Sequence, residues 1–536
     1  MKILTRAPNV SLTHGKPDKT LMKFFPLACI SAVLISFCQT ELLSSDSPPN
    51  ILLIMADDMG WSDIGCYGGD IDTPNIDRMA REGVRFSNFY NNGKCTITRA
   101  SLLTGLYPRN GGRGIELLNE NMVTLGEALL LAGYQTGMSG KWHNGSRKPF
   151  RPFDRGFQES YGLWDGCCNF FDPSRADPKF KGRRVRFFGE NDRRITEFPD
   201  DFYTTDAFTD HALQTIRDQV ARGKPFFHYL AYTAPHYPLQ ARPEDIAKYH
   251  GKFSEGWDAL RKRRYQRQVK MGVINPAIFP DPGPNPDNQP WETGRNQDIE
   301  WENLRMEVYA AMVDRMDQNI GRILNLLDNL QIADNTMVLF LSDNGGCSET
   351  PGGNDTSQRP GPKEFYSHVG PNWAYAQNTP FRRYKAYTHE GGIASPLVVR
   401  WPRKVKAGTI SDQVAHIVDF MPTFLDAAGG TYPLIYGNKA IIPEEGISLV
   451  PVLGGSGEGT ILERPAPLFW FWGKNRAIRE GNWKLVWEQK SGKGWELYDL
   501  SRDRTETKNL ASSHPAKVEQ LSQKWFSWAT MTGVKY

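Results

Sequence analysis

Four short apolar runs constrain the fold of this chain more than any other feature of its sequence. They are Asn50–Ala56, Tyr134–Gly140, Phe226–Ala234 and Thr336–Ser342, and each ends abruptly in polar or charged residues. Apolar runs without alternation are typical of strands that are buried on both faces. Because helical stretches separate the runs, we predict an α/β fold with a large mixed, mostly parallel central sheet flanked by helices.

The second half of the chain contains the clearest helix and a change of composition. Apolar residues recur at spacings of three and four over Glu300–Gln331, which predicts a long amphipathic helix. After about residue 430, short aromatic runs at 467–472, 476–487 and 495–500 predict strands, and a last helix is predicted near Pro515. We therefore predict a large domain over residues 48–430 and a small α+β subdomain over 431–536, with an antiparallel sheet and one helix.

The amino terminus indicates export. Residues 1–45 are predicted to be a leader, and the apolar stretch 24–37 has the length of a signal-peptide core and is too short to span a bilayer. The protein is therefore expected in the periplasm or outside the cell. Leu34–Cys38 also resembles a lipoprotein cleavage site, which would anchor the chain through Cys38, but Phe37 stands where a small residue is expected.

Charge limits the classes of partner. The net charge is only +4 over 536 residues, so the composition does not favour nucleic acid, and any anion site must be local. The basic stretch Leu260–Lys270 is predicted to be a helix with a solvated, mostly dispensable charged face. A contact surface for a polyanionic substrate is the alternative interpretation of this stretch. The sequence does not indicate an oligomeric state.

The polar ends of the four runs supply candidate metal ligands. Carboxyl ends of parallel strands meet at one edge of a sheet, where ligands bind. Asp57, Asp58, Asp343 and Asn344 offer only oxygen atoms, which suits one hard cation, calcium or alternatively magnesium. A single Asp after a strand more often caps a helix, so the metal site depends on both clusters meeting.

Four further residues offer positive charge and groups that transfer protons. Lys141 and His143 follow the second run, His236 follows the third, and Lys385 lies farther along the chain. If they share the same edge of the sheet, they form an anion pocket in a protein of nearly neutral charge.

These positions belong to a longer pattern. Cys95-Thr96-Ile97-Thr98-Arg99 followed by Leu103-Thr104-Gly105 resembles the signature of the formylglycine-dependent sulfatases, of the arylsulfatase type in the alkaline phosphatase-like superfamily. The resemblance runs from about residue 49 to near the end of the chain. Its other parts are Asp57-Asp58, Gly140-Lys141-Trp142-His143, Pro235-His236, Asp343-Asn344-Gly345, Lys385 before Glu390-Gly391-Gly392, and Leu497-Tyr498-Asp499-Leu500.

The resemblance implies that the large domain hydrolyses a sulfate ester to an alcohol and inorganic sulfate. In this family the cysteine is oxidised to formylglycine, whose hydrate carries two hydroxyl groups on one carbon. One hydroxyl attacks sulfur and the alcohol leaves; the other then loses its proton, which expels sulfate. Applied to this chain, the modified Cys95 would also bind the metal ion, together with Asp57, Asp58, Asp343 and Asn344.

The resemblance also assigns roles to the cationic residues. Arg99 would hold the hydrate, while Lys141 and Lys385 would neutralise the sulfate oxygens. His236 would protonate the leaving alcohol, and His143 would assist the elimination step. A formylglycine-generating enzyme or maturase is implied as a partner before folding.

One position departs from the family pattern. The family usually has Pro, or less often Ala, where this chain has Ile97, and that residue helps the modifying enzyme to recognise the unfolded segment. The substitution leaves the catalytic groups in place and makes inefficient conversion of Cys95 the expected consequence.

Two other functions remain open from the sequence. A phosphodiesterase or phosphonate hydrolase of the same superfamily would act on a related tetrahedral ester, and an unconverted Cys95 would leave a non-catalytic binder of sulfated glycans. The alcohol half of the substrate, an aryl group or a carbohydrate, is not encoded in any motif. Loops such as 144–200 are expected to determine it.

Overall fold

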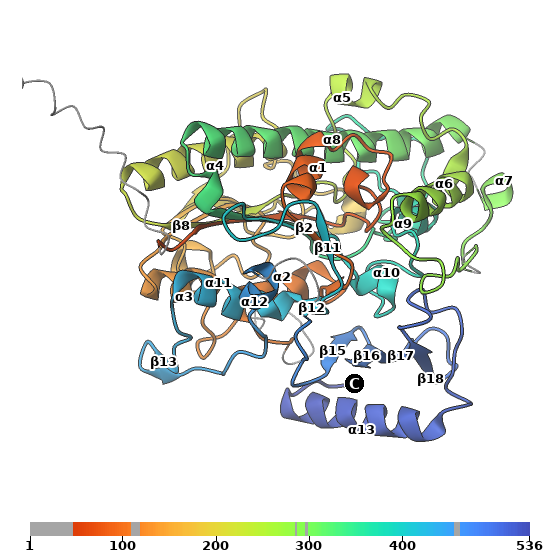
Figure 1. The fold of residues 1–536 in the computed structure, drawn as a ribbon. Coiled ribbons are helices and arrows are strands. Elements are labelled where there is room, and N and C mark those ends of the chain that lie inside the picture. The colour runs from red at the N-terminus through yellow and green to blue at the C-terminus, as the bar shows by residue number, and fades with distance from the viewer. Residues whose placement is uncertain (1–46, 109–117, 285–286, 295–297, 455–460) are drawn as a thin grey trace, which may run out of the picture. The chain divides into compact units, whose positions relative to one another are not determined.

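A ten-stranded sheet lies at the centre of the computed structural model (Figure 1). The strands follow the order β11-β2-β10-β9-β1-β8-β4-β5-β6-β7. The five from β9 to β5 are parallel, whereas β10 and β6 run antiparallel to their neighbours. The predicted mixed sheet with a parallel centre is therefore confirmed. The bounds of its strands are β1 (Asn50–Ala56), β2 (Val84–Phe86), β4 (Gln135–Gly140), β5 (Glu159–Leu163), β6 (Phe188–Glu190), β7 (Arg193–Ile195), β8 (Phe226–Ala231), β9 (Thr336–Ser342), β10 (Leu397–Arg400) and β11 (Thr409–Ser411).

The four apolar runs of the sequence are the four adjacent parallel strands β9, β1, β8 and β4. Every residue of β4, β8 and β9 is buried, as is all of β1 after Asn50. Because the four strands are parallel neighbours, the polar residues that follow them meet at one edge of the sheet.

Helices cover both faces of the sheet (Figure 1). Alternate residues of β1 point to opposite faces: Ile51 and Leu53 pack in one hydrophobic core, and Leu52 and Ile54 pack in the other. The first core includes α2 (Cys95–Thr104), α3 (Leu125–Leu131) and α11 (Phe420–Ala428). The second includes α1 (Pro74–Arg81), α4 (Thr204–Ala221) and α8 (Ile299–Asn329), so the long predicted helix is confirmed.

The C-terminal part is an antiparallel sheet with one helix, as predicted. Its strands are β15 (Leu468–Trp472), β16 (Asn475–Glu480), β17 (Trp483–Trp487) and β18 (Trp495–Asp499), in that order. Helix α13 (Pro515–Met531) packs on β16 and β17. The described residues from Pro48 onward form one compact unit, so the boundary between residues 430 and 431 stays a prediction.

The structure describes residues 47–108, 118–284, 287–294, 298–454 and 461–536. The predicted leader, its apolar core 24–37 and Cys38 lie outside these ranges. Within them, no helix is both long and apolar enough to cross a membrane. The remaining regular elements are β3 (Phe89–Tyr90), α5 (Pro243–Ala247), α6 (Gly256–Lys270), α7 (Trp291–Gly294), α9 (Gly370–Gln377), α10 (Glu390–Ile393), β12 (Ala415–His416), β13 (Ile435–Tyr436), β14 (Lys439–Ala440), α12 (Val450–Gly454) and the short 3-10 turns η1 (Gly65–Tyr67), η4 (Phe153–Arg155), η5 (Lys179–Lys181), η6 (Ala333–Asn335) and η7 (Ile417–Asp419).

The prediction for the basic stretch Leu260–Lys270 is partly wrong. The stretch is helical, as α6, but two of its arginines are buried. The Arg264 guanidinium pairs with Asp63 at 2.6 Å and with Asp70 at 3.1 Å, and Arg261 donates to the carbonyl oxygen of Tyr375 at 2.8 Å. Arg264 thus ties α6 to the loop after β1, and Arg261 ties it to the segment 375–381. Because buried charges need such partners, both arginines are structural and not dispensable.

Candidate active site

The two acidic clusters meet, although 284 residues separate Asp58 from Asp343 along the chain. Asp57 and Asp58 follow β1, and Asp343 and Asn344 follow β9. The Asn344 side-chain amide donates to Asp58 Oδ1 at 2.7 Å, and the backbone N–H of Asp58 donates to Asp343 Oδ1 at 3.1 Å. All four side chains are buried. They form a single oxygen-rich cluster at the predicted edge of the sheet.

Cys95 is the first residue of α2 and lies against this cluster. Its Sγ atom and one carboxylate oxygen each of Asp57 and Asp343 all lie within 4.8 Å of one another. The helix begins at Cys95 itself, four residues before Arg99. Lys94, which precedes it, provides no side-chain cap, so the first helical amides lend positive potential at Cys95.

The Cys95 thiol is free and buried. Burial raises its pKa, an effect only partly offset by the positive charges of Lys141 and Lys385. An unmodified thiol at this position is therefore protonated at neutral pH and a weak nucleophile. Cys66, Cys167, Cys168 and Cys347 are free as well, so the described cysteines form no disulfide.

Arg99 lies one helical turn after Cys95 and organises the cluster. Its Nε and Nη2 atoms donate to Asp343 Oδ2 at 3.0 and 2.8 Å, and its Nη1 atom donates to the carbonyl oxygen of Lys141 at 2.9 Å. The guanidinium is fully buried. A buried guanidinium with these partners fixes Asp343 relative to Cys95.

Lys141 and Lys385 each lie on one aspartate of the cluster. The Lys141 ammonium donates to Asp57 Oδ2 at 2.6 Å, and the Lys385 ammonium donates to Asp58 Oδ2 at 2.6 Å. Both lysines are buried. Two ammonium groups from different elements thus meet beside Cys95, as an anion pocket requires.

The two predicted histidines differ in their surroundings. His236 Nδ1 lies 2.6 Å from the carbonyl oxygen of Tyr237 and must donate to it, which leaves Nε2 facing Asp58 Oδ2 at 3.4 Å. Burial lowers the pKa of His236, although Asp58 acts in the opposite direction. Burial and the charges of Lys141 and Arg99 lower the pKa of His143, whose buried Nδ1 has no hydrogen-bond partner among the described residues. All the predicted site residues thus gather around Cys95, and their roles stay predictions.

The cluster fits a divalent cation. Asp57 Oδ1 and Asn344 Oδ1 are buried and accept no hydrogen bond from any described residue. Burial also raises the pKa of Asp57, and the neighbouring Lys141 offsets only part of this effect. Carboxylate and amide oxygens in this state are the donors that calcium and magnesium take up. The sequence-based choice between these two ions stays open.

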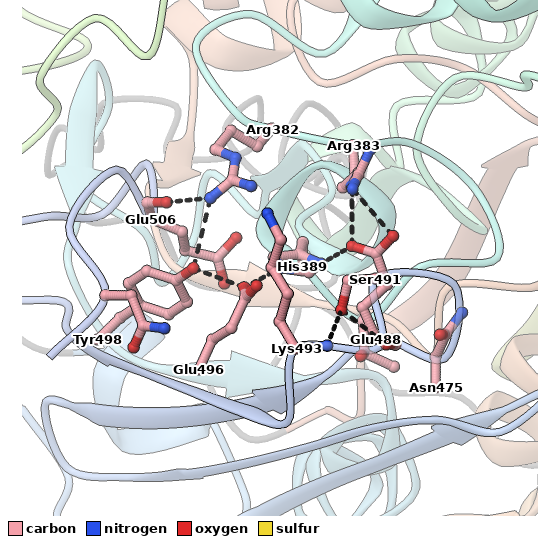
Figure 2. A network of polar contacts seen from close by, with 12 residues as sticks. Arg382, Arg383, His389, Asn475, Glu488, Ser491, Lys493, Glu496, Tyr498 and Glu506 are labelled. Atoms are coloured by element: carbon pink, nitrogen blue, oxygen red, sulfur yellow. Dashed lines mark hydrogen bonds and ion pairs between the residues drawn. The ribbon is translucent and has the colours of Figure 1, made fainter. Parts of the chain in front are cut away.

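The C-terminal sheet holds the loop that carries Lys385 (Figure 2). Arg383 forms a bidentate pair with Glu488, with contacts of 2.8 to 3.1 Å, and His389 Nε2 lies 2.9 Å from Glu496. The Asn475 side chain donates to the carbonyl oxygen of Ala386 at 2.9 Å. The backbone on both sides of Lys385 is therefore fixed by residues that lie about 90 to 110 positions farther along the chain.

Several residues around the site were not predicted. Tyr229 in β8 accepts from Arg99 at 3.3 Å, and the Tyr237 hydroxyl donates to Glu349 Oε2 at 2.7 Å. Glu349 also pairs with Lys94 and lies 3.6 Å from Lys385. Lys94 could have been predicted from the sequence, because it precedes Cys95. Glu349 belongs to no motif, and only the folded structure brings it to the site.

Comparisons with known proteins agree with this geometry. The family model named Sulfatase matches residues 49–430, and that of the N-sulphoglucosamine sulphohydrolase C-terminal region matches residues 382–526. An uncharacterized sulfatase of Schizosaccharomyces pombe is 34% identical over 91% of this chain and 94% of its own length. An arylsulfatase of Klebsiella aerogenes is 31% identical over 75% of this chain and 91% of its own.

A solved structure shares the fold. Ps i-CgsB, in complex with k-i-k-neocarrahexaose, is 26% identical with a TM-score of 0.64, and the match covers 90% of this chain and 93% of that one. The family match covers most of the chain, and its range includes all of the site residues described above. The chain therefore belongs to the sulfatase family, whose members hydrolyse sulfate esters.

Proposed function

We propose that this sulfatase acts on a sulfated carbohydrate, with Cys95 converted to formylglycine and one divalent cation at the oxygen cluster. The observation that carries the proposal is the position of Cys95. It begins a helix, contacts two buried aspartates and lies beside two buried ammonium groups. A carbohydrate is favoured because Ps i-CgsB is 26% identical and was solved with neocarrahexaose, and because human N-acetylgalactosamine-6-sulfatase is 33% identical over 78% of this chain.

Asp57, Asp58, Asp343, Asn344 and the modified residue 95 would hold the cation, which would supply Lewis-acid polarisation of a sulfate oxygen. The formylglycine hydrate would supply a hydroxyl nucleophile that a buried, protonated thiol lacks. Arg99 contributes orientation, because it bonds both to Asp343 and to the backbone of Lys141. Binding of the sulfate group and protonation of the leaving alcohol are then left to the two lysines and the two histidines.

Lys141 and Lys385 would bind the sulfate oxygens. Each is held on an aspartate at 2.6 Å, so its ammonium is already oriented toward the cluster before substrate arrives. His236, as the doubly protonated imidazolium, would give a proton from Nε2 to the leaving oxygen while its Nδ1–H stays bonded to the carbonyl of Tyr237. His143 has a free buried Nδ1 and would assist release of sulfate.

The proposal is tested at Cys95. Mass spectrometry of the peptide around residue 95 should find an aldehyde fraction, and turnover of a small aryl sulfate should scale with that fraction across preparations. Cys95→Ala should reduce turnover to background and leave the melting temperature nearly unchanged, since the Cys95 thiol forms no disulfide and no hydrogen bond with the other described residues. Full activity in a preparation that contains only the thiol would contradict the proposed nucleophile. Faster hydrolysis of an aryl phosphate than of the matching sulfate would favour the phosphoesterase alternative.

A further inference from the structure

A row of aromatic rings leads outward from His236. The His236 and Tyr237 ring centres are 4.0 Å apart, those of Tyr237 and Tyr366 are 6.0 Å apart, and those of Tyr366 and Phe180 are 5.6 Å apart. Tyr237 and Tyr366 are each 9% exposed, whereas Phe180 is 48% exposed. The row therefore begins at the candidate proton donor and ends in solvent, on the side where the leaving alcohol would depart.

The loop that presents Phe180 carries positive charge without matching negative charge. Residues 175–183 include Arg175, Lys179, Lys181 and Arg183, and none of these four pairs with a carboxylate of the described residues. In contrast, the next two arginines of the chain are paired, Arg184 with Asp165 and Arg186 with Asp177. Unpaired cations beside an exposed aromatic ring indicate a surface for an anionic ligand.

Tyr237 connects this loop with the candidate site. The Lys181 ammonium lies 5.2 Å from the centre of the Tyr237 ring, and the Lys385 ammonium lies 5.8 Å from it. Lys385 is neutralised by Asp58 at 2.6 Å, whereas Lys181 has no such partner. An anion bound at Lys181 would thus lie near the anion bound at Lys385, close enough for both to belong to one substrate molecule.

A small cavity lies beside the row of aromatic rings. A cavity of about 110 Å³ beside Tyr366 is lined by two cations, Arg175 and Lys363, and by two carboxylates, Asp177 and Glu364. Because Asp177 is already paired with Arg186, the two cations face one remaining carboxylate across the cavity. Phe180, the exposed end of the aromatic row, offers an apolar ring face on which the apolar face of a sugar ring can pack.

We propose that Phe180, Tyr366, Tyr237 and the loop 175–183 form the leaving-group subsite, and that it binds a carbohydrate chain bearing a second anionic group close to the scissile sulfate. This inference rests on the proposed function, because it uses His236 as the proton donor to the leaving alcohol. It goes further by naming a polyanionic saccharide as the substrate and Lys181 as the residue that selects it. The second anion is a sulfate or a carboxylate, which share the chemistry that Lys181 recognises.

The test compares four substrates on Lys181→Gln and Phe180→Ala. The substrates are a small aryl sulfate, an oligosaccharide with one sulfate, and oligosaccharides of equal length with a second sulfate or a carboxylate. For Lys181→Gln, we expect the loss of kcat/KM on the doubly anionic chains to exceed the loss on the aryl sulfate by about 10-fold, and the difference to shrink as salt rises. Phe180→Ala should weaken all the oligosaccharides more than the aryl sulfate. The doubly anionic substrate whose kcat/KM falls most in Lys181→Gln identifies the second anion as a sulfate or a carboxylate.

The matched control is Lys404→Gln with Lys406→Gln. Both lysines are exposed and follow β10, where the backbone of Arg403 contacts Asp334 ahead of β9, at the end of the sheet opposite the site. This control should change no substrate preference. Equal losses on all substrates for Lys181→Gln, or none on the doubly anionic chains, would overturn the subsite.

A binding measurement separates this inference from the proposed function. In the Cys95→Ala background, calorimetry with the doubly anionic oligosaccharide should give a Kd that Lys181→Gln weakens by about 10-fold. If the wild-type protein hydrolysed no sulfate ester but this difference remained, the proposed function would fail and the subsite would stand. If the enzyme were active and Lys181→Gln bound the chain as tightly as its parent, the subsite would fail alone.

Discussion

Two clusters of buried charged residues lie near Lys385. They differ in whether their carboxylate and amide oxygens accept hydrogen bonds from within the protein. In the cluster around Cys95, Asp57 Oδ1 and Asn344 Oδ1 accept no hydrogen bond from the described residues, although the Arg99 guanidinium lies 3.7 Å from Asp57 Oδ1. In the cluster toward the C-terminal sheet, both carboxylate oxygens of Glu390, Glu488 and Glu506 are paired within the protein. The first cluster is therefore open to a ligand, and the second is closed. This difference separates binding residues from structural ones more clearly than charge or burial does.

The largest difference between the clusters should appear on metal removal. A chelator should abolish sulfatase activity and lower the melting temperature, and calcium at about 100 times its Kd should restore about 2.7 kcal/mol of stability. Asp57→Asn should remove the response to calcium and the activity, because it removes a buried carboxylate of the open cluster. Magnesium titrated in the same assay distinguishes the two candidate ions.

Asp63→Asn is the control for this experiment. Asp63 is also buried and lies six residues after Asp57, but it is paired with Arg264 at 2.6 Å. The substitution should lower stability and leave the calcium response intact. A calcium response that persists in Asp57→Asn, or that disappears in Asp63→Asn, would show that the open cluster is not the metal site.

Much of this comparison was accessible from the sequence. The polar residues after four apolar runs predicted the open cluster, because adjacent parallel strands bring their carboxyl ends together whatever the loops between them do. Arg264 was misread because its partners Asp63 and Asp70 lie about 200 residues earlier in the chain, and Arg261 because its partners are backbone carbonyl oxygens such as that of Tyr375. Glu349 and Glu488 meet the site only through long-range packing, which no local pattern encodes.

Substitutions in the closed cluster should mainly lower the stability of the folded protein. Glu488→Gln leaves the Arg383 guanidinium, which is 9% exposed, without its bidentate carboxylate, and should cost about 3 kcal/mol of unfolding free energy. Turnover should fall as well, because Arg383 lies two residues before Lys385 in the chain. Denaturant unfolding and kcat for an aryl sulfate measure the two effects.

A paired replacement sharpens this prediction. Arg383→Met with Glu488→Leu removes both charges at once and should recover most of the lost stability. If Glu488→Gln were as stable as the wild type, the second cluster would not be a structural network. If the paired variant were stable but inactive, the pair would act on catalysis through the position of Lys385.

A smaller effect should depend on pH. Burial raises the pKa of Glu496, but the hydrogen bond and charge of His389 lower it to about 2. A Glu in the unfolded chain titrates at about pH 4.3. The paired carboxylate of Glu496 therefore stabilises the folded state above that pH, and this stabilisation is lost as the pH falls toward about 2. Glu496→Gln should therefore cost roughly 2 kcal/mol near pH 6, and its difference from the wild type should shrink by pH 3.

Unfolding by urea at several pH values measures this dependence. Glu480→Gln is the control, because Glu480 pairs with Lys524 on the surface, where both side chains are about one-third or more exposed. That substitution should cost less than about 0.5 kcal/mol at every pH. A constant difference between Glu496→Gln and the wild type across the range would mean that the His389 contact does not stabilise the ionised carboxylate.

The smallest expected effect concerns Ile97, where the sequence departs from the family signature. Ile97 is fully buried in the first turn of α2 and packs with Ala100 against Trp472 of the C-terminal sheet. Proline is tolerated by the backbone there, because first-turn amides have no intrahelical acceptor. It would, however, replace a packed branched side chain, and we expect a loss of about 1 kcal/mol. The residue thus contributes to the folded state as well as to recognition before folding.

Ile97→Pro should therefore change two quantities in opposite directions. Because proline fixes the backbone in a shape that isoleucine must be ordered into, the modified fraction of Cys95 should rise, and activity per milligram should rise with it. The melting temperature should fall slightly at the same time. Ile97→Ala distinguishes the effect of packing from that of the backbone, since it removes the packing with Trp472 and leaves the backbone free. It should lower the melting temperature without the rise in the modified fraction of Cys95 that is expected of proline. If Ile97→Pro left the aldehyde fraction unchanged while activity rose, position 97 would act on the finished site, through Trp472, and not on its maturation.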